Sequence, residues 1–272
     1  MLKKTLLYFF LITYAVVILY PIAWVFVSSL KDNASIITNP YSFPKELKWN
    51  NFYNAWKEAK MGQALLNSLI VTGCSVIGVA FLAAMVSYPI ARLTFKWRGI
   101  LYALFISGLF VAPVTALIPL LKLLSRLNLV DSYWALVLPY IAFGLPLSVA
   151  IMRSFYIGLP RNLEDAAKVD GLGTWKTFWK IIFPLAKPAL YTVIILQVIN
   201  SWNEYLFALV FIRSPHNFTI PRAVATFSGT FQTDYGLLNA AIVISALPTI
   251  IIYLIFAERI RGAMAIRVGG KG

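Results

Sequence analysis

The sequence has few of the side chains on which soluble enzymes depend. It contains one cysteine, one histidine and ten acidic residues in 272 positions. The single cysteine, Cys74, excludes an intrachain disulfide and a cysteine-rich metal cluster. His216 stands between Pro215 and Asn217, which is typical of a solvated loop rather than of a catalytic or metal-binding position. An intramembrane enzyme needs a nucleophile with its base, or several metal ligands, close together, so these numbers argue against one.

Charge is also scarce. Only 12% of the residues are charged, 60% are hydrophobic, and the mean hydropathy is +0.77. This apolar content far exceeds that of an ordinary soluble domain and predicts an all-α membrane protein. The formal net charge of +14 has the sign found in nucleic-acid-binding proteins, but the cations lie in short segments between long apolar runs rather than in one stripe. We therefore expect a lipid bilayer around the chain and no nucleic-acid partner.

Six segments are apolar enough to cross a bilayer as helices, since a spanning helix needs about 20 mainly apolar residues. They cover residues 6–29, 64–90, 100–121, 133–155, 189–212 and 236–257. The first follows Lys3 and Lys4, as in a signal peptide, but its apolar run is too long for a typical cleaved signal, so we expect a retained anchor. No internal repeat occurs at a fixed period, and residues 1–272 are expected to form a single transmembrane domain.

Lysine and arginine are distributed unevenly between the two sides of these six segments. Fifteen lie on the side that carries both termini, and nine lie on the other side, where five acidic residues dilute them. Because juxtamembrane cations favour the cytoplasmic side, we predict that both termini are cytoplasmic. This orientation places residues 31–63 outside, where the aromatic run Trp49, Phe52, Tyr53 and Trp56 favours an interfacial helix.

The largest predicted cytoplasmic segment, 156–188, is too short for a catalytic domain but contains a patterned stretch. It predicts a short helix with Asn162 as a candidate cap, acidic residues in the first turn and Gly171 as its stop. A second amphipathic helix is predicted from Thr174 to the interruption at Pro184. Small and acidic residues on the first helix suit docking into the groove of a basic partner, although an ordinary amphipathic surface loop fits the same pattern.

The spacing of this stretch resembles the cytoplasmic EAA motif of permease subunits in binding-protein-dependent ABC importers. The matching positions are Asp165, Ala166, Ala167, Gly171, Ile181, Phe183 and Pro184. Asp165 stands where Glu is usual and Phe183 where Leu is usual, and both departures preserve charge or apolarity. Residues 67–69, 201–208 and 269–272 are similar to the maltose-type carbohydrate permeases, so the resemblance covers nearly the whole chain.

This resemblance implies a coupling helix between the fourth and fifth spans, seated in a cleft of an ATPase subunit. The residues implied in that contact are Glu164, Asp165, Ala166, Ala167, Asp170 and Gly171. The implied partners are a second homologous permease, two copies of a P-loop ATPase and an extracytoplasmic solute-binding protein, in a bacterial or archaeal cytoplasmic membrane. The C-terminal residues 267–272 resemble an extension that reaches towards the ATPase in this family, and their glycines equally suit a disordered end.

The energy source is expected to lie in another chain. No segment matches G-x-x-x-x-G-K-[ST], the phosphate-binding loop of such ATPases. ATP and Mg are therefore expected to bind the partner ATPase, and no cofactor or metal is expected to bind this chain. Movement of the ATPase would then rock the spans between inward-facing and outward-facing arrangements.

A polar stripe crosses the fifth apolar segment. Gln197, Asn200 and Glu204 recur at helical spacing, and Asn203 and Tyr205 flank them. An ionisable residue inside a span is costly and marks a transport pathway or a packing contact. The stripe predicts either the lining of a hydrated sugar cavity or hydrogen bonds to the second permease.

Proline and glycine interrupt the apolar pattern of the third and fourth segments. The residues are Pro113, Pro119, Pro139, Gly144 and Pro146. Such residues are tolerated where neighbouring helices or water satisfy the freed backbone groups. They favour kinks around a cavity, and kinks for packing alone explain them equally well.

The reading that combines these features is a permease subunit of an ATP-driven importer of a sugar or oligosaccharide. One alternative keeps the architecture with another solute, such as a glycerol phosphate or oligopeptide. An anionic solute calls for a basic cavity, and no lysine or arginine lies in the middle of any span. A second alternative is an ion-coupled secondary transporter with Glu204 as its proton site, against which the EAA spacing argues.

Overall fold

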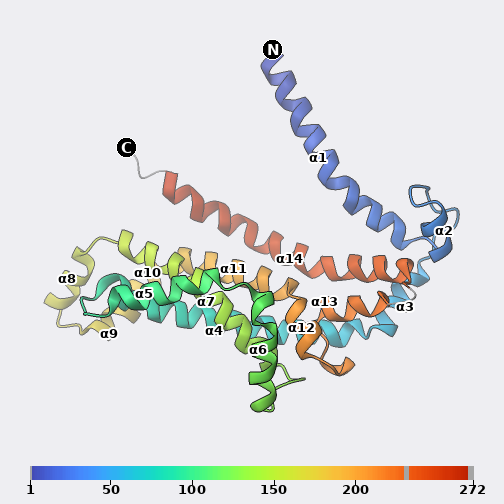
Figure 1. Ribbon diagram of the computed structural model, residues 1–272. Coiled ribbons are helices and arrows are strands. Elements are labelled where there is room, and N and C mark those ends of the chain that lie inside the picture. Colours follow the sequence, from blue (N-terminus) through green and yellow to red (C-terminus); the bar gives the residue numbers. More distant parts are fainter. Residues whose placement is uncertain (1, 230–232, 269–272) are drawn as a thin grey trace. The chain divides into compact units, whose positions relative to one another are not determined.

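The computed structural model describes residues 2–229 and 233–268, and in this part of the chain every regular element is a helix or helical turn (Figure 1). The chain divides into two compact units. Met1–Leu65 with Thr219–Ile251 form the first, and Leu66–Phe218 with Ile252–Gly272 form the second. The helical content agrees with the all-α class predicted from composition.

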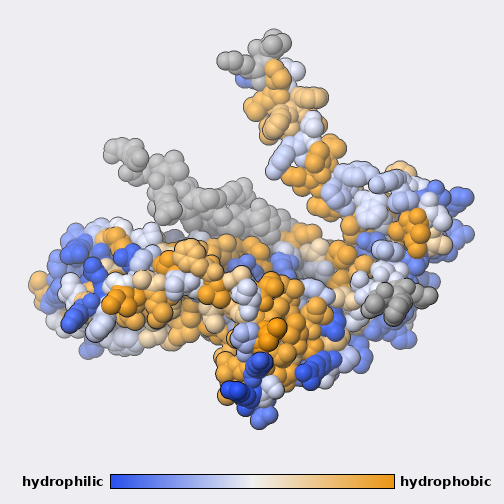
Figure 2. Space-filling model, in the orientation of Figure 1, coloured by the Kyte–Doolittle hydropathy of each residue, from blue (hydrophilic) through white to orange (hydrophobic). Residues whose placement is uncertain are grey.

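The first unit combines long apolar helices with short ones. Its elements are α1 (Leu2–Ser29), α2 (Asn33–Thr38), α3 (Asn50–Glu58), the start of α4 (Met61–Arg92), α13 (Ile220–Val224), η4 (Ala225–Phe227) and the first part of α14 (Tyr235–Val268). The large side chains of α1 are exposed almost throughout, and Figure 2 shows orange, apolar stretches along this helix. Such a surface suits contact with lipid or another subunit rather than water.

Lys31 orders the loop that follows α1. Its side chain is 1% exposed, and Nζ donates to the carbonyl oxygens of Asn39 (2.7 Å) and Ser42 (3.0 Å) and to the Ser42 hydroxyl (3.2 Å). A buried ammonium is tolerated when such acceptors replace its water shell. The carboxylate of Asp32 then starts α2 by accepting a hydrogen bond from the Ser35 amide at 2.9 Å. The predicted external segment is therefore an ordered loop.

The aromatic run in this loop does enter a helix, as the sequence predicts. α3 contains Phe52, Tyr53 and Trp56, and the side chains of Tyr53 and Trp56 are exposed. Asn51 ties the helix to the end of α1 by donating to the carbonyl oxygens of Ser29 and Lys31. The interfacial position of α3 stays a prediction.

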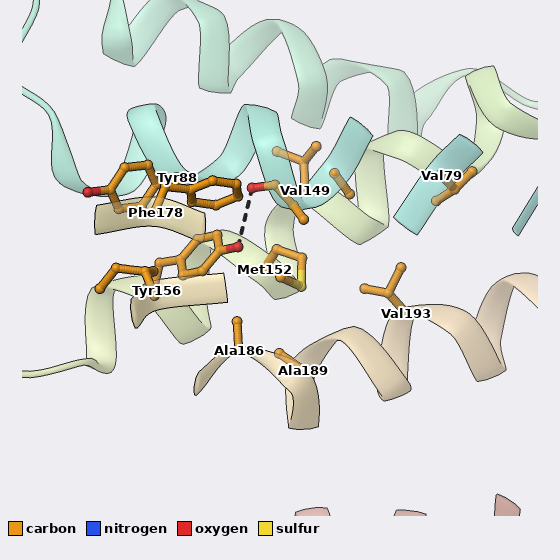
Figure 3. Packing of buried hydrophobic residues seen from close by; sticks show 12 residues of the cluster. Val79, Tyr88, Val149, Met152, Tyr156, Phe178, Ala186, Ala189 and Val193 are labelled. Carbon is orange, nitrogen blue, oxygen red and sulfur yellow. Dashed lines mark hydrogen bonds between the residues drawn. The ribbon is translucent and has the colours of Figure 1, made fainter. Parts of the chain in front are cut away.

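The second unit packs its helices around a shared apolar core. Its elements after α4 are α5 (Arg98–Ser107), η1 (Gly108–Phe110), α6 (Pro113–Arg126), α7 (Trp134–Gly158), α8 (Asn162–Val169), α9 (Thr174–Thr177), the π-helical turn η2 (Phe178–Ile182), α10 (Phe183–Leu185), α11 (Lys187–Asn203), α12 (Leu206–Phe211) and η3 (Pro215–Asn217). Tyr88 of α4, Met152 and Tyr156 of α7 and Val193 of α11 meet in the core (Figure 3). The Tyr156 hydroxyl donates to the carbonyl oxygen of Ala84 at 3.3 Å, which satisfies a buried polar group.

Three of the six predicted spans are continuous helices long and apolar enough to cross a membrane, namely α1, α4 and α7. α7 runs without a break through Pro139, Gly144 and Pro146. These residues do not end the helix, and the kinks expected at them stay a prediction. A helix inside a bundle tolerates proline because its neighbours satisfy the freed backbone groups.

The third predicted span, 100–121, is not a single helix. Arg98–Phe110 and Pro113–Arg126 are bent by 103° relative to one another. Proline has no N–H and disfavours helical backbone in the residue before it, so Ala112 is extended and Pro113 begins a new helix. The sharp bend replaces the straight span expected from hydropathy, and it agrees with the kink predicted at Pro113.

The fifth predicted span, 189–212, is also broken. α11 ends at Asn203, Glu204 has extended backbone with ψ 126°, and α12 begins at Leu206. Upstream, Thr174–Leu185 and Lys187–Asn203 are bent by 72°. Hydropathy detects the apolar run but not this break, because the break depends on where the Glu204 side chain binds.

The last predicted span corresponds to α14, in which Tyr235–Ile251 forms a shorter apolar helical stretch. Counting each bent pair as one span, the described residues contain up to five segments long and apolar enough to cross a membrane. The tail predicted to reach the ATPase, 267–272, starts within the last residues of α14, and residues 269–272 lie outside the described part of the chain.

Candidate functional site

Two regions of the second unit hold the predicted functional residues. α8 and α9 lie at one end of the unit, remote from α12 (Figure 1). The first region is α8 with the residues that flank it, 159–173, which we call the α8 loop. The second is a cavity beside α12.

α8 ends at Val169, with Asp170 as its C-cap, and Gly171 follows as the stop that the sequence predicts. This glycine has φ +73°, its N–H donates to the carbonyl oxygen of Lys168, and the Leu172 N–H donates to that of Ala167 at 2.9 Å. This is a Schellman motif, which requires left-handed backbone and so favours glycine. The beginning differs from the prediction, because Asn162 is the first helical residue and Arg161 precedes it without a side-chain cap.

The two acidic residues of α8 point in different directions. Glu164 is half-buried, and its Oε1 accepts a hydrogen bond from Arg92 Nε at 3.0 Å. The Asp165 side chain is 70% exposed and contacts only the equally exposed Lys168, at 3.5 Å. Exposed pairs of this kind contribute little to stability, so Asp165 is available to another molecule.

The two alanines divide in the same way. Ala167 is buried against its own chain, whereas Ala166 is exposed beside Asp165. Val169, one turn further along, is 88% exposed, and Asp170 is also exposed. The outward face of α8 is therefore small, apolar and acidic, and Val169 is a member that the motif did not identify. Its position four residues after Asp165, and so on the same helix face, is the sequence signal that could have found it.

Arg92 is the other residue of this region that sequence reasoning missed. It ends α4, and its side chain is 4% exposed. Its Nη1 donates to the carbonyl oxygen of Leu159 at 3.0 Å and its Nη2 to that of Pro160 at 3.2 Å, in addition to the bond to Glu164. No local pattern could have found this contact, because Arg92 and Glu164 are 72 residues apart in the sequence.

The segment after α8 braces it, in a form different from the one predicted. Thr174 is the first residue of α9 rather than its cap, and η2 separates α9 from α10, which contains Pro184. Proline cannot donate to the carbonyl four residues earlier, and a π turn accommodates this loss. Phe178 of this turn is buried against Tyr88 at a ring distance of 5.1 Å.

The cavity beside α12 has a volume of about 570 Å³ and lies between α7, α11 and the two helix breaks. Its lining residues are Gly108, Leu109, Val111, Pro113, Tyr140, Phe143, Gly144, Gln197, Asn200, Ser201, Asn203, Glu204, Tyr205, Leu206 and Phe207. All five residues of the predicted polar stripe are among them. The lining combines amides, one carboxylate and aromatic rings, and it holds no lysine or arginine.

Glu204 is bound within its own chain. Its Oε2 accepts a hydrogen bond from the Tyr140 hydroxyl at 2.7 Å, and its Oε1 accepts one from the Phe207 amide at 2.8 Å. The Ala208 amide also donates to Oε2, at 3.3 Å. A carboxylate at the N-terminus of a helix satisfies free amides and interacts favourably with the helix dipole. Glu204 thus starts α12, which explains the break in the fifth segment.

Gln197 is also bound within the chain. It is 4% exposed, and its Nε2 donates to the Tyr140 carbonyl at 3.2 Å and to the Ser201 hydroxyl at 2.8 Å. Gly144 makes room for it, because a Cβ added there would lie 2.2 Å from Gln197 Oε1. Asn200 and Asn203 are exposed, and of these Asn203 also donates from Nδ2 to the carbonyl oxygen of Ile199 at 2.9 Å. The predicted stripe therefore splits into residues that order the wall and residues that are open to the cavity.

The end of the unit that carries η3 is held by two polar residues that the sequence did not single out for this role. Asn67 is buried, donates to the carbonyl oxygens of His216 (2.7 Å) and Phe218 (2.9 Å), and accepts a hydrogen bond from the Tyr133 hydroxyl (2.8 Å). His216 thus contributes its backbone carbonyl. Among the described residues, no group of three or more His, Cys, Asp or Glu side chains could hold a metal ion.

Asp131 is the second of these residues. It accepts hydrogen bonds from the amides of Arg213 and Ser214, each at 3.0 Å, and from the Ser214 hydroxyl. Burial raises the pKa of this carboxyl, but the hydrogen bonds outweigh burial and hold the pKa below its usual range. The loop before α7 is therefore joined to the loop after α12.

The profile of the family described as "Binding-protein-dependent transport system inner membrane component" matches residues 76–264. The chain belongs to this family. Its members are the membrane permease subunits of importers, so the resemblance seen in the EAA spacing is confirmed.

Named relatives of this permease cover most of its length. It is 34% identical to the probable ABC transporter permease protein YurM of Bacillus subtilis over 94% of this chain and 85% of that protein. It is 32% identical to the diacetylchitobiose uptake system permease protein NgcG of Streptomyces coelicolor, over 94% and 85%. It is 32% identical to the trehalose/maltose transport system permease protein MalG of Thermococcus litoralis, over 95% and 94%.

Solved structures show the same permease fold. A chain from the crystal structure of a bacterial ABC transporter involved in the import of the acidic polysaccharide alginate superposes with a TM-score of 0.82. The match covers 94% of this permease and 96% of that chain, at 19% identity. Fold is preserved here although most side chains differ.

Proposed function

We propose that this permease translocates a neutral sugar or oligosaccharide, delivered by an extracytoplasmic binding protein, through an ATP-driven importer. The observation that carries the proposal is the cavity of about 570 Å³ beside α12. Its exposed amides, Asn200 and Asn203, can hydrogen-bond sugar hydroxyls, and Tyr140, Phe143 and Tyr205 offer aromatic faces. Relatives named for diacetylchitobiose and for trehalose or maltose, each 32% identical, support this substrate class.

The proposed topology has six spans in one transmembrane domain, with both termini in the cytoplasm. α1, α4 and α7 serve as three spans, the pair α5–α6 and the segment containing α11 as bent ones, and α14 as the sixth. Exposed apolar side chains on α6, such as Val114 and Ile118, support its contact with lipid or a second permease (Figure 2). The cation distribution supports the orientation.

In this proposal α8 is the coupling helix, and its outward face docks on one of two P-loop ATPase subunits, which bind ATP and Mg. Asp165, Ala166, Val169 and Asp170 make the contact, and Gly171 sets the end of the helix. Glu164 and Ala167 position the helix from its inner side. A second homologous permease completes the membrane part, and alternating access follows from rocking of the two permeases.

Affinity purification of the tagged chain in mild detergent, with mass spectrometry of the proteins that accompany it, tests the assembly. Recovery of a P-loop ATPase and a second permease is the expected result. Recovery of this chain alone, stable and monodisperse, contradicts the proposal and favours an ion-coupled transporter. The binding protein encoded or recovered with the complex is then titrated with neutral disaccharides and with glycerol phosphate, and preference for glycerol phosphate contradicts the sugar assignment.

A further inference from the structure

We propose that Arg92 is a positioning residue that joins the coupling helix to α4, so that displacement of α8 moves α4 instead of being absorbed by the linker before α8. This inference rests on the proposed role of α8 in ATPase docking. It concerns a residue outside the EAA motif that touches neither the outward face of α8 nor the cavity.

The three hydrogen bonds of Arg92 reach both the linker and the helix. The linker consists of the residues between the end of α7 at Gly158 and the start of α8 at Asn162. Nη1 and Nη2 donate to the linker carbonyls of Leu159 and Pro160, and Nε donates to Glu164 in the first turn of α8. One side chain therefore fixes the linker and the helix to the same point.

The environment makes these bonds stronger than an ordinary surface pair. The Arg92 side chain is 4% exposed and that of Glu164 is 17% exposed. Hydrogen bonds between ionised groups are about twice as strong as neutral ones, and limited solvent access reduces their screening. The pair of Lys168 and Asp165 on the same helix, 75% and 70% exposed, lacks this shielding.

The anchor point itself is rigid. Tyr88, one turn before Arg92 on α4, packs against Tyr156 of α7 and Phe178 of η2, with ring distances of 5.8 Å and 5.1 Å (Figure 3). Because α4 is embedded in the core on one side and bound to α8 on the other, a push on α8 is transmitted to a long helix.

Lysine cannot replace Arg92 in this arrangement. The guanidinium presents three nitrogens in a planar fork, and each of the three acceptors here takes a different nitrogen. A lysine ammonium keeps the charge but offers a single nitrogen at the end of a flexible chain. If the three hydrogen bonds matter, Arg92→Lys should behave like Arg92→Met. If only the positive charge matters, Arg92→Lys should behave like the wild type.

The first measurement is hydrogen exchange of residues 159–169 in the purified complex. Arg92→Met and Arg92→Lys should both raise exchange in this segment by about tenfold or more, because the linker and the first turn of α8 lose their shared partner. Lys96→Met is the matched control, since Lys96 is an exposed cation four residues away whose ammonium lies over the Trp97 ring at 5.8 Å. Unchanged exchange in both Arg92 variants overturns the connection.

The second measurement follows the cavity without a substrate. In a Cys74→Ser, Asn200→Cys background, ATP should change the rate at which a maleimide labels position 200 in the reconstituted complex. Arg92→Met should leave ATP hydrolysis within about twofold and reduce the ATP-dependent change in labelling by about tenfold, whereas Lys96→Met should alter neither. An undiminished labelling change in Arg92→Met overturns the transmission.

The failure of the proposed function is distinguishable from the failure of this inference. A wild-type chain that recovers no ATPase refutes the proposed function and the transmission with it, whatever the exchange result. A wild-type complex that hydrolyses ATP and changes its labelling, beside an Arg92→Met complex that does the same, refutes the transmission alone. The double variant with Glu164→Gln adds a check. If Arg92 and Glu164 act through one connection, the double variant reduces the labelling change by less than the sum of the two single variants. Additive reductions contradict the connection.

Discussion

The α8 loop and the cavity beside α12 hold their carboxylates in different ways. Glu164 is paired with the guanidinium of Arg92, so the two charges cancel. Glu204 accepts hydrogen bonds from the neutral Tyr140 hydroxyl and from backbone amides of α12, so the cavity wall keeps a negative charge stabilised by a helix N-terminus. In each region one carboxylate orders the chain, and exposed neighbours such as Asp165 remain to contact another molecule.

Reversing the charge of Glu164 should have the largest effect. Glu164→Lys places an ammonium beside the nearly buried Arg92, and we expect the free energy of unfolding to fall by about 3 kcal/mol. Asp165→Lys is the matched control, because that side chain is 70% exposed. It should change stability by less than about 0.5 kcal/mol while lowering the yield of co-purified ATPase. Equal destabilisation by the two variants in thermal unfolding contradicts the division of roles.

A methyl group at Gly144 should disturb the cavity wall next most strongly. Its Cβ would lie 2.2 Å from Gln197 Oε1 and 2.9 Å from a methyl group of Val79. Gly144→Ala should therefore cost about 1–3 kcal/mol in thermal unfolding. Gly73→Ala on α4 is the control, since a Cβ there meets no atom within 4 Å. A Gly144→Ala protein as stable as the control shows that Gln197 is free to move away.

Removing the charge of Glu204 tests whether it orders the wall or contacts the substrate. Glu204→Gln replaces one acceptor oxygen by a donor facing the Tyr140 hydroxyl or the α12 amides, and should cost about 1–2 kcal/mol. Asn200→Ala, on an exposed position of the same cavity, should leave stability unchanged and alter substrate preference. Assembly and specificity are measured separately. Lost assembly with unchanged specificity in Glu204→Gln favours the packing role.

Replacing Gly171 should have a smaller effect on stability than on coupling. Alanine in its left-handed backbone costs about 1–2 kcal/mol, although a Cβ there meets no atom within 4 Å. Gly158→Ala, at the end of α7 with equally open space, should cause no loss. We expect Gly171→Ala to insert normally and to transport less per ATP hydrolysed. Normal uptake by this variant contradicts the assignment of α8 as the coupling helix.

The smallest effect concerns Asp131 at the end that carries η3. Because its pKa is lowered in the folded state, its carboxylate stabilises the fold above the ordinary pKa of 3.8, and this contribution is lost as the pH falls through the lower folded value. Asp131→Asn should lose stability at neutral pH and show a weaker decline below about pH 4. Parallel acid-unfolding curves for the wild type and the variant contradict this role.

Local sequence patterns predicted the helical class, the apolar segments and the α8 loop well. The stop at Gly171 could be predicted because left-handed backbone after a helix depends only on one residue and its turn. Pro113 predicted a kink in the third segment, but no pattern predicted the break of the fifth segment at Glu204. Hydropathy averages over a window, so it does not register that Pro113 begins a new helix or that Glu204 caps one. Glu204 was selected as costly in a span, yet its donors could not be named.

The candidate sites were predicted as sets of residues, and the structure divides each set. The resemblance to the EAA motif placed Glu164 and Asp165 in one contact, although one faces the core and the other faces outward. The direction depends on Arg92, which lies 72 residues away. The relation of Asn67 to His216 spans 149 residues and was equally beyond local reasoning.

By itself, the sequence determined that this chain is a helical membrane permease of a binding-protein-dependent importer, because apolar length, cation placement and the EAA spacing are all local or additive properties. Only the tertiary structure decided which polar residues are occupied within the chain and which remain open to partners. Arg92 donates a hydrogen bond to Glu164, and Tyr140 donates one to Glu204, although the partners are far apart in the sequence. A carboxylate that is costly to bury takes the nearest donors in space, and distance in space is set by helix packing rather than by order along the chain.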